Sequence, residues 1–221
     1  MSIRTGILTL LGILLASVVG ANADELIIMC GADAFVCSDD WANNNYGNRG
    51  YSPRAVGHQN EYTGEQIGRQ LYRFEIPPGV TQVISAQAVL KMFDNFAGFP
   101  VETSVRGLED VWEEMAVTWN TQPSADSDIL STVLAGCCGI TYTYDITAYV
   151  QSQLALGDHT ICLQQRKLDE STIGGVRWFQ REGEGILYGI IWGESPELHL
   201  ETGPTPVEAT TWGAIKTLFG R

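Results

Sequence analysis

The stretch Val101-Glu102-Thr103-Ser104-Val105-Arg106-Gly107 alternates between one set of residues at odd positions and another at even positions. Val, Thr and Val take the odd positions, and Glu, Ser and Arg take the even ones. A period of two is that of a β-strand with one face buried, because successive side chains point to opposite faces. The same alternation recurs over residues 86–92 and 140–146, where Ala86, Ala88, Leu90 and Met92 and then Ile140, Tyr142, Tyr144 and Ile146 form the apolar sets.

Further strands are predicted where short apolar segments stand between turn signals. The turn signals include Asn45-Tyr46-Gly47, Pro77-Pro78-Gly79 and Gly183-Glu184-Gly185. The predicted strands cover residues 26–30, 34–37, 70–76, 160–164, 175–180, 186–191 and 197–201.

One helix is predicted from Thr147 to Leu156, with Thr147 as its cap and with Val150 and Leu154 on one face. Many short strands and a single helix favour two packed antiparallel sheets. We therefore expect an all-β fold, a single antiparallel β-sandwich of jelly-roll type with one short helix, over residues 24–203.

The first 23 residues have the pattern of a secretory signal peptide. Arg4 is followed by an apolar run from Ile7 to Val19 and by the triplet Ala21-Asn22-Ala23, a typical cleavage site. The run is too short to span a bilayer. We expect cleavage after Ala23, no membrane insertion afterwards, and a protein that is secreted, extracellular or at the cell surface; the alternative is an uncleaved N-terminal anchor.

Residues 204–221 differ in composition from what precedes them. A stiff Gly203-Pro204-Thr205-Pro206 break comes first, and apolar residues with helical spacing follow it at Trp212, Ile215, Leu218 and Phe219. This tail could fold back on the domain or fray at the chain end. The other hypothesis is a sorting or attachment tail that export or surface machinery recognises.

The chain is strongly acidic. It has 13 Lys and Arg against 26 Asp and Glu, and removal of Arg4 with the leader leaves 12 − 26 = −14. Such a charge repels polyanions, so it argues against nucleic acid as a partner and against uronate polymers. Divalent cations complement it.

All five cysteines, Cys30, Cys37, Cys137, Cys138 and Cys162, follow the leader. In an oxidising compartment disulfides are the expectation, with one thiol left over because the number is odd. The pairing stays open, and the spacings match no zinc site.

Several short motifs follow one another along the chain, each occurring once. They are Asp33-Ala34-Phe35-Val36, Asn45-Tyr46-Gly47, Tyr72-Arg73-Phe74-Glu75, Ser85-Ala86-Gln87-Ala88-Val89-Leu90, the stretch Trp112 to Asn120, Tyr144-Asp145-Ile146-Thr147, Phe179-Gln180-Arg181-Glu182 and Ser195-Pro196-Glu197-Leu198. In this order they resemble the DNRLRE domain, the group that includes carbohydrate-binding module family 96. The resemblance covers residues 26–201 and implies a β-sandwich that binds carbohydrate.

The resemblance also singles out residues within these motifs. Trp112, Glu114, Thr118 and Trp119 fall where the family has its tryptophan, acid, threonine and second tryptophan. We expect structural roles, with the rings filling a sandwich edge while the carboxylate and hydroxyl satisfy backbone donors. Asp145 and Thr147 have the same expected role at a strand end and helix cap.

A sugar ring needs exposed aromatic faces, with amides and carboxylates to read its hydroxyl groups. Trp41, Tyr46, Tyr51 and Tyr62 stand in loops rich in Asn, Gln and Gly, and are the predicted carbohydrate-binding residues. Phe96 and Phe99 lie in another loop. Aromatic residues of loops can also fold inward.

Calcium is a second expectation. Asp33, Asp39, Asp40 and Asn43 could supply the oxygen ligands that calcium takes, although their spacing is not that of an EF-hand. Turn formation by Asp and Asn explains the same residues without an ion.

No sequence motif of a known catalytic centre is present, so we expect no catalytic residues and no enzyme. Carboxylate pairs such as Glu109-Asp110, Glu113-Glu114 and Glu182 with Glu184 keep a glycosidase open. The leading hypothesis is a secreted, non-catalytic module that binds a polysaccharide or an extracellular-matrix glycan. The alternatives are a structural cell-surface protein attached through its tail, and a polysaccharide lyase or hydrolase.

Overall fold

The computed structural model describes residues 23–47, 56–60, 65–95, 97–136, 139–181, 185–187, 190–192 and 195–203. The expected signal peptide and tail therefore lie almost wholly outside the described residues. The strands are β1 Asp24–Met29, β2 Ala32–Cys37, β3 Tyr46–Gly47, β4 Val56–Asn60, β5 Glu65–Glu75, β6 Val83–Asn95, β7 Val101–Gly107, β8 Ser131–Ala135, β9 Thr141–Asp145, β10 Thr160–Lys167, β11 Gly174–Trp178, β12 Gly185–Leu187, β13 Ile190–Trp192 and β14 Glu197–Thr202; the helices are the 3-10 turn η1 Asp39–Trp41 and α1 Thr147–Ala155.

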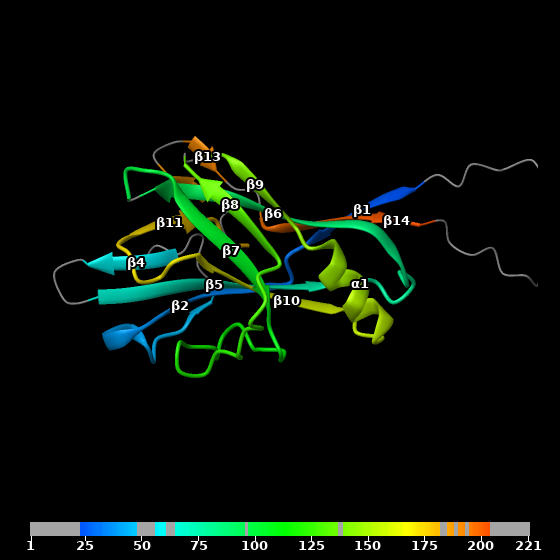
Figure 1. The fold of residues 1–221 in the computed structure, drawn as a ribbon, viewed down its shortest axis with the longest axis horizontal. Helices are drawn as coiled ribbons and strands as arrows, with labels where there is room; N and C mark the ends of the chain where they lie inside the picture. The colour runs from blue at the N-terminus through cyan, green and yellow to red at the C-terminus, as the bar shows by residue number, and fades with distance from the viewer. Residues whose placement is uncertain are drawn as a thin grey trace, which may run out of the picture.

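The strands form two layers that face each other across one core (Figure 1). One layer contains β1, β14, β6 and β9, and the other contains β2, β5, β10, β7 and β8. Strands β11 and β4 connect the layers, because β11 pairs with β6 on one side and β4 on the other. All these pairings are antiparallel, which confirms the predicted all-β sandwich. The jelly-roll connectivity stays a prediction.

The alternating stretches lie where the sequence predicts them. β7 has the predicted bounds, with Val101, Thr103 and Val105 buried, and the apolar set of β6 from Ala86 to Met92 faces the core. Ile140 departs from its pattern: it precedes β9 and is exposed.

Helix α1 buries Val150 and Leu154 as predicted. Thr147, however, is not its cap. Ile146 takes the cap position, and the hydroxyl of Thr147 donates to Asp145 Oδ1 over 2.6 Å. The carboxylate two residues earlier thus competes successfully for that hydroxyl.

Some strands differ from the predictions. β4 and β8 were not expected, because Val56-Gly57-His58-Gln59-Asn60 has a single large apolar residue and β8 is a short edge strand paired with β7. The predicted strand 186–191 is instead two strands, β12 and β13, which pair with each other. The apolar run contains Gly189, a residue that weakens a continuous strand.

Strand β2 is buried on both faces. Phe35 and Cys37 contribute to the core between the layers, while Ala32, Ala34 and Val36 face outward. These outward residues are covered by the stretch from Leu108 to Ala125, which contributes Leu108, Trp112 and Val117 to a second apolar cluster. We call residues 108–125 the covering segment.

The cysteine expectation is wrong for the described part of the chain. Cys30, Cys37 and Cys162 are all buried as thiols. Cys30 and Cys37 face the main core, whereas Cys162 faces the second cluster. The sheet therefore separates Cys162 from the other two thiols. Burial raises the pKa of the Cys162 thiol to about 12 and also raises that of Cys30. Cys137 and Cys138 lie outside the described residues.

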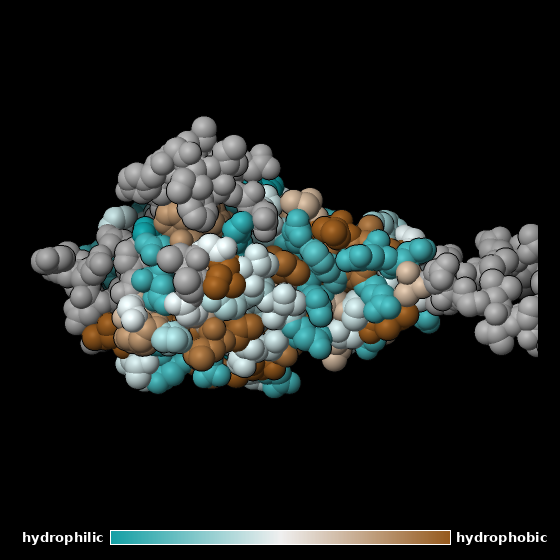
Figure 2. Space-filling view, turned by 90° about the horizontal axis from the view of Figure 1, so that it is seen from above, coloured by the Kyte–Doolittle hydropathy of each residue, from teal (hydrophilic) through white to brown (hydrophobic). Residues whose placement is uncertain are grey.

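No helix among the described residues is long and apolar enough to cross a membrane. The exposed aliphatic residues are scattered rather than gathered: Figure 2 shows hydrophobic groups separated by hydrophilic ones on the face seen from above.

A polar chain crosses the apolar core. The Tyr72 hydroxyl donates to Gln165 Oε1 (3.0 Å), Gln165 Nε2 donates to the Tyr144 oxygen (2.8 Å), and this oxygen also shares a hydrogen bond with Thr103 Oγ1 (2.7 Å). Burial raises the pKa of Tyr144, more than these hydrogen bonds lower it.

This chain yields a stability prediction. Tyr144→Phe should lower the free energy of unfolding by about 1–3 kcal/mol, because Gln165 and Thr103 lose a buried partner. Folded Tyr144 keeps its proton above pH ~10, where the unfolded residue loses it, so wild-type stability falls as pH rises beyond that value.

Urea unfolding at neutral and alkaline pH measures both effects, and the variant should show the shallower alkaline decline. Tyr142→Phe is the matched control, since it removes the same hydroxyl from a partly exposed neighbour on β9. Equal losses in the two variants would contradict the assigned role of the buried chain.

Candidate functional site

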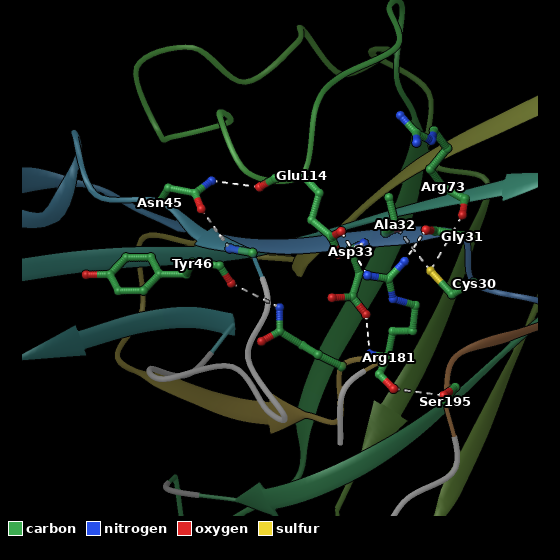
Figure 3. A network of polar contacts seen from close by, with 12 residues as sticks. Cys30, Gly31, Ala32, Asp33, Asn45, Tyr46, Arg73, Glu114, Arg181 and Ser195 are labelled. Carbon is green, nitrogen blue, oxygen red and sulfur yellow. Dashed lines mark hydrogen bonds and ion pairs between the residues drawn. The ribbon is translucent and has the colours of Figure 1, made fainter. Parts of the chain in front are cut away.

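Segments far apart in the sequence meet at one place beside β2 (Figure 3). Asp33 comes from β2, Asn45 precedes β3, Glu114 belongs to the covering segment, and Arg181 follows β11. Each belongs to one of the ordered motifs of the sequence. We call these four residues the motif network.

Glu114 is the centre of the motif network. Its Oε1 accepts the backbone N–H of Asp33 over 3.1 Å, and its Oε2 lies 2.9 Å from Arg181 Nη2. Its carbonyl oxygen accepts from Asn45 Nδ2 over 2.7 Å. One glutamate of the covering segment therefore contacts three segments that are far apart in the sequence.

Arg181 closes the network from the other side (Figure 3). Its backbone N–H donates to Asp33 Oδ2, and its Nη1 donates to the carbonyl of Gly31. Its own carbonyl oxygen accepts from Ser195 Oγ over 3.1 Å. Asp33 itself is fully buried, so this carboxylate is engaged inside the protein.

The motif Asn45-Tyr46-Gly47 requires glycine at its last position. A Cβ on Gly47 would lie 2.3 Å from the carbonyl oxygen of Glu114, which is too close for any side chain. The close approach of these two backbones is what brings Asn45 Nδ2 within reach of the carbonyl oxygens of Glu114 and Val117.

The two motif tryptophans anchor the covering segment, and an arginine lies over each ring. Trp112 is buried; Arg73 lies 5.9 Å from its ring centroid and donates to its carbonyl oxygen. Trp119 is partly buried, and Arg69 lies 4.5 Å from its ring centroid.

The remaining motif residues make local contacts. The backbone N–H and the hydroxyl of Thr118 both contact Thr121 Oγ1, at 2.9 and 3.0 Å. Asp145 accepts from the hydroxyl and backbone N–H of Thr147, and these two hydrogen bonds lower the pKa of Asp145. Thr147 also accepts the backbone N–H of Ala86, so the pair ties the start of α1 to β6.

The predicted calcium ligands do not gather. Asp33 is buried in the motif network, whereas Asp39 and Asp40 are exposed in η1. Asp39 accepts from Ser38 Oγ, and Asn43 Oδ1 accepts from Asn120 Nδ2 over 2.8 Å. Within the described residues, no three His, Cys, Asp or Glu side chains are grouped to hold a metal ion. Calcium stays a prediction.

The predicted sugar-binding aromatics are divided. Tyr46 has 5% of its area exposed and packs against Phe35 and Trp41, so the structure places its ring in the core. Trp41 is partly buried. Tyr51 and Tyr62, like Phe96, lie outside the described residues.

The carboxylates named as possible pairs differ in their surroundings, and Glu109 and Asp110 are both exposed. Glu113 is exposed, while both carboxylate oxygens of Glu114 are engaged in the motif network. Glu182 and Glu184 lie outside the described residues. On β14, His199 Nε2 lies 2.6 Å from Glu197 Oε2.

Arginines gather on the outer face of β5, β10 and β7, a feature that sequence reasoning missed. Even-numbered residues of β10 face outward, because Cys162 enters the second cluster and Gln164 contacts Gln122 of the covering segment. Arg166 lies on this face, opposite Ser104, and Arg106 lies opposite Gln164. We call Arg69, Arg106 and Arg166 the arginine face.

The charges of the arginine face are unequally compensated. Arg69 forms a two-pronged ion pair with Glu170, at 2.9 and 2.8 Å. Arg106 donates to the carbonyl oxygens of Asp126 and Ser127, which carry no net charge. Among the described residues, no hydrogen bond or ion pair reaches the guanidinium group of Arg166.

Arg166 is in an unfavourable environment for a cation. Burial, and next the charges of Arg106 and Arg69, lower the pKa of its guanidinium group, and Glu170 opposes the shift. Exposed Leu134 lies on β8, opposite Glu102 of β7, and exposed Leu168 directly follows the end of β10. This region thus combines positive charge that is only partly compensated with nearby aliphatic surface.

Comparison with known families gives one match. The family model described as carbohydrate-binding module family 96 matches residues 27–185, well over half of the chain. This span contains the motif network and the arginine face. No curated protein matches the sequence.

Glu114→Ala should lower the free energy of unfolding by about 2–3 kcal/mol, because a buried N–H of Asp33 and a guanidinium lose their acceptor together. Glu114→Gln should cost less, since the amide oxygen can still accept from Asp33. Chemical denaturation measures both, and Glu113→Ala is the exposed neighbouring control. A control as destabilised as Glu114→Ala would rule out a special role for Glu114.

Proposed function

The chain belongs to carbohydrate-binding module family 96, and from this membership we propose that it is a secreted, non-catalytic protein that binds a polysaccharide or an extracellular-matrix glycan. The leader-like first 23 residues support secretion. The engagement of Glu114 in the motif network supports a non-catalytic role, because a general acid or base must reach the substrate.

The arginine face is the proposed ligand-binding surface. The observation that carries this proposal is Arg166, a partly buried cation whose guanidinium forms no hydrogen bond or ion pair in the described part of the chain, and on which the charges of Arg106 and Arg69 act against that of Glu170. A group of this kind is costly to maintain unless an anion meets it. Carboxylates and sulfates fit the fork of a guanidinium, so we infer that the glycan is acidic.

This inference reverses what net charge alone suggests. The whole chain is acidic, yet ligand attraction at contact distance depends on the local field, since more distant charges are screened by salt over about 8–10 Å. Exposed Leu134 and Leu168 supply apolar surface for the carbon faces of sugar rings.

The proposed function predicts that Arg166→Gln weakens binding to dextran sulfate or polygalacturonate by at least roughly tenfold. The expected cause is the loss of a charge-assisted contact, so the salt dependence of binding should decrease as well. Isothermal titration calorimetry over a salt series measures both quantities. Lys91→Gln removes the same charge from β6 in the opposite layer and is the matched control.

Uncharged dextran separates charge from general sugar affinity. Equal affinity for dextran and dextran sulfate would contradict the acidic ligand, and equal losses in the two variants would contradict the location. Binding to no polysaccharide of a broad panel would contradict glycan binding itself.

The same assay tests calcium. We expect affinity for the acidic polymer to be unchanged when a chelator replaces calcium, because arginines supply the positive charge directly. A roughly tenfold loss with chelator would instead place a cation between protein and glycan. Asp39→Asn and Asp40→Asn would then identify the ligands.

A further inference from the structure

Strand β1 forms an edge of its layer. It pairs with β14 over its whole length, from Asp24 opposite Thr202 to Met29 opposite Glu197. On its other side no strand of the described structure follows it (Figure 1). Unpaired N–H and C=O groups along an edge can pair with a further strand.

The composition of β1 does not protect this edge. Natural edge strands carry central charges, prolines or bulges that prevent pairing. In β1 the acidic residues Asp24 and Glu25 stand at the first two positions, and Leu26-Ile27-Ile28-Met29 follows without interruption. Its register with β14 contains no bulge.

The apolar half of β1 is exposed on one side. Ile27 has 50% of its area exposed and Met29 has 52%, while Leu26 and Ile28 pack against the core. The exposed pair therefore lies on the outer surface at the very edge of the layer, where a neighbouring strand would cover it.

We propose that β1 pairs with β1 of a second copy of this chain, antiparallel and centred on Ile27. In this register Ile27 meets Ile27, Leu26 meets Ile28, and Glu25 meets Met29 of the other copy. The acidic residues of the two copies then lie at opposite ends, so no like charges meet across the interface. The sequence of β1 is thus compatible with pairing to itself.

The pairing is isologous. The β1 edge of each copy is covered by that of the other, so the assembly closes as a two-fold symmetric dimer. One layer is then continuous across the two copies. If the proposed function also holds, the dimer presents two arginine faces and binds a polymer with increased avidity. This last consequence rests on the proposed function, whereas the dimer does not.

Salt distinguishes the dimer from glycan binding. Two copies with formal charge −13 or below repel each other, so higher salt should strengthen dimerisation. Binding of an acidic glycan to arginines should weaken under the same change. The two proposals can therefore fail separately.

Sedimentation equilibrium of the purified protein over a range of concentration and salt tests the proposal. We expect a reversible monomer–dimer equilibrium whose dissociation constant falls with salt. Ile27→Lys should raise that constant by at least roughly tenfold, because it places a charge in the centre of the pairing. Ile84→Lys is the matched control, since Ile84 is 51% exposed but lies on β6, an internal strand of the same layer.

Circular dichroism and thermal unfolding verify that the variants fold. If Ile27→Lys does not fold, Met29→Lys provides a second edge variant. A wild-type protein that remains monomeric at every concentration and salt would overturn the proposal. So would equal effects of the edge variants and Ile84→Lys, or assembly beyond the dimer.

Discussion

The hydrogen bond from the Asp33 backbone to Glu114, together with the ion pair of Glu114 with Arg181, joins β2, the covering segment and the chain after β11. These contacts hold the covering segment on the outside of β2, which allows that strand to be apolar on both faces. The covering segment in turn places Trp119 beneath Arg69 and Gln122 against Gln164. The border of the arginine face is therefore set by contacts of residues that lie outside that face.

The sandwich could be predicted because its central strands are amphipathic. In β6 and β7 the residues that face the core alternate with residues that are on the whole more polar or more exposed, so the sequence has a period of two. β4 follows no such rule: its buried residues include a histidine, and its place between β5 and β11 is set by tertiary pairing. The thiols were misjudged for a related reason, since cysteine is equally suited to a disulfide and to an apolar core.

The candidate site was harder to predict than the fold. Asp33 and Glu114 are 81 residues apart in the sequence, and nothing local indicates that one accepts a hydrogen bond from the other. Arg106 and Arg166 likewise come from different strands, and only the register of β7 with β10 brings them onto one face. Net charge averages over the whole surface, so it does not show that several arginines lie on one face. The three-dimensional distribution of a few cations contains the information that composition lacks.

The sequence distances within the motif network have a consequence for how the chain folds. Arg181 reaches back 148 residues to Asp33 and 67 residues to Glu114. A polypeptide that emerges from its N-terminus first therefore cannot complete the motif network until the last fifth of the chain has appeared. Non-local closure of this kind slows folding and prolongs the time during which apolar strands are exposed. The order in which the chain is synthesised therefore places the closing contact of this network near the end of folding.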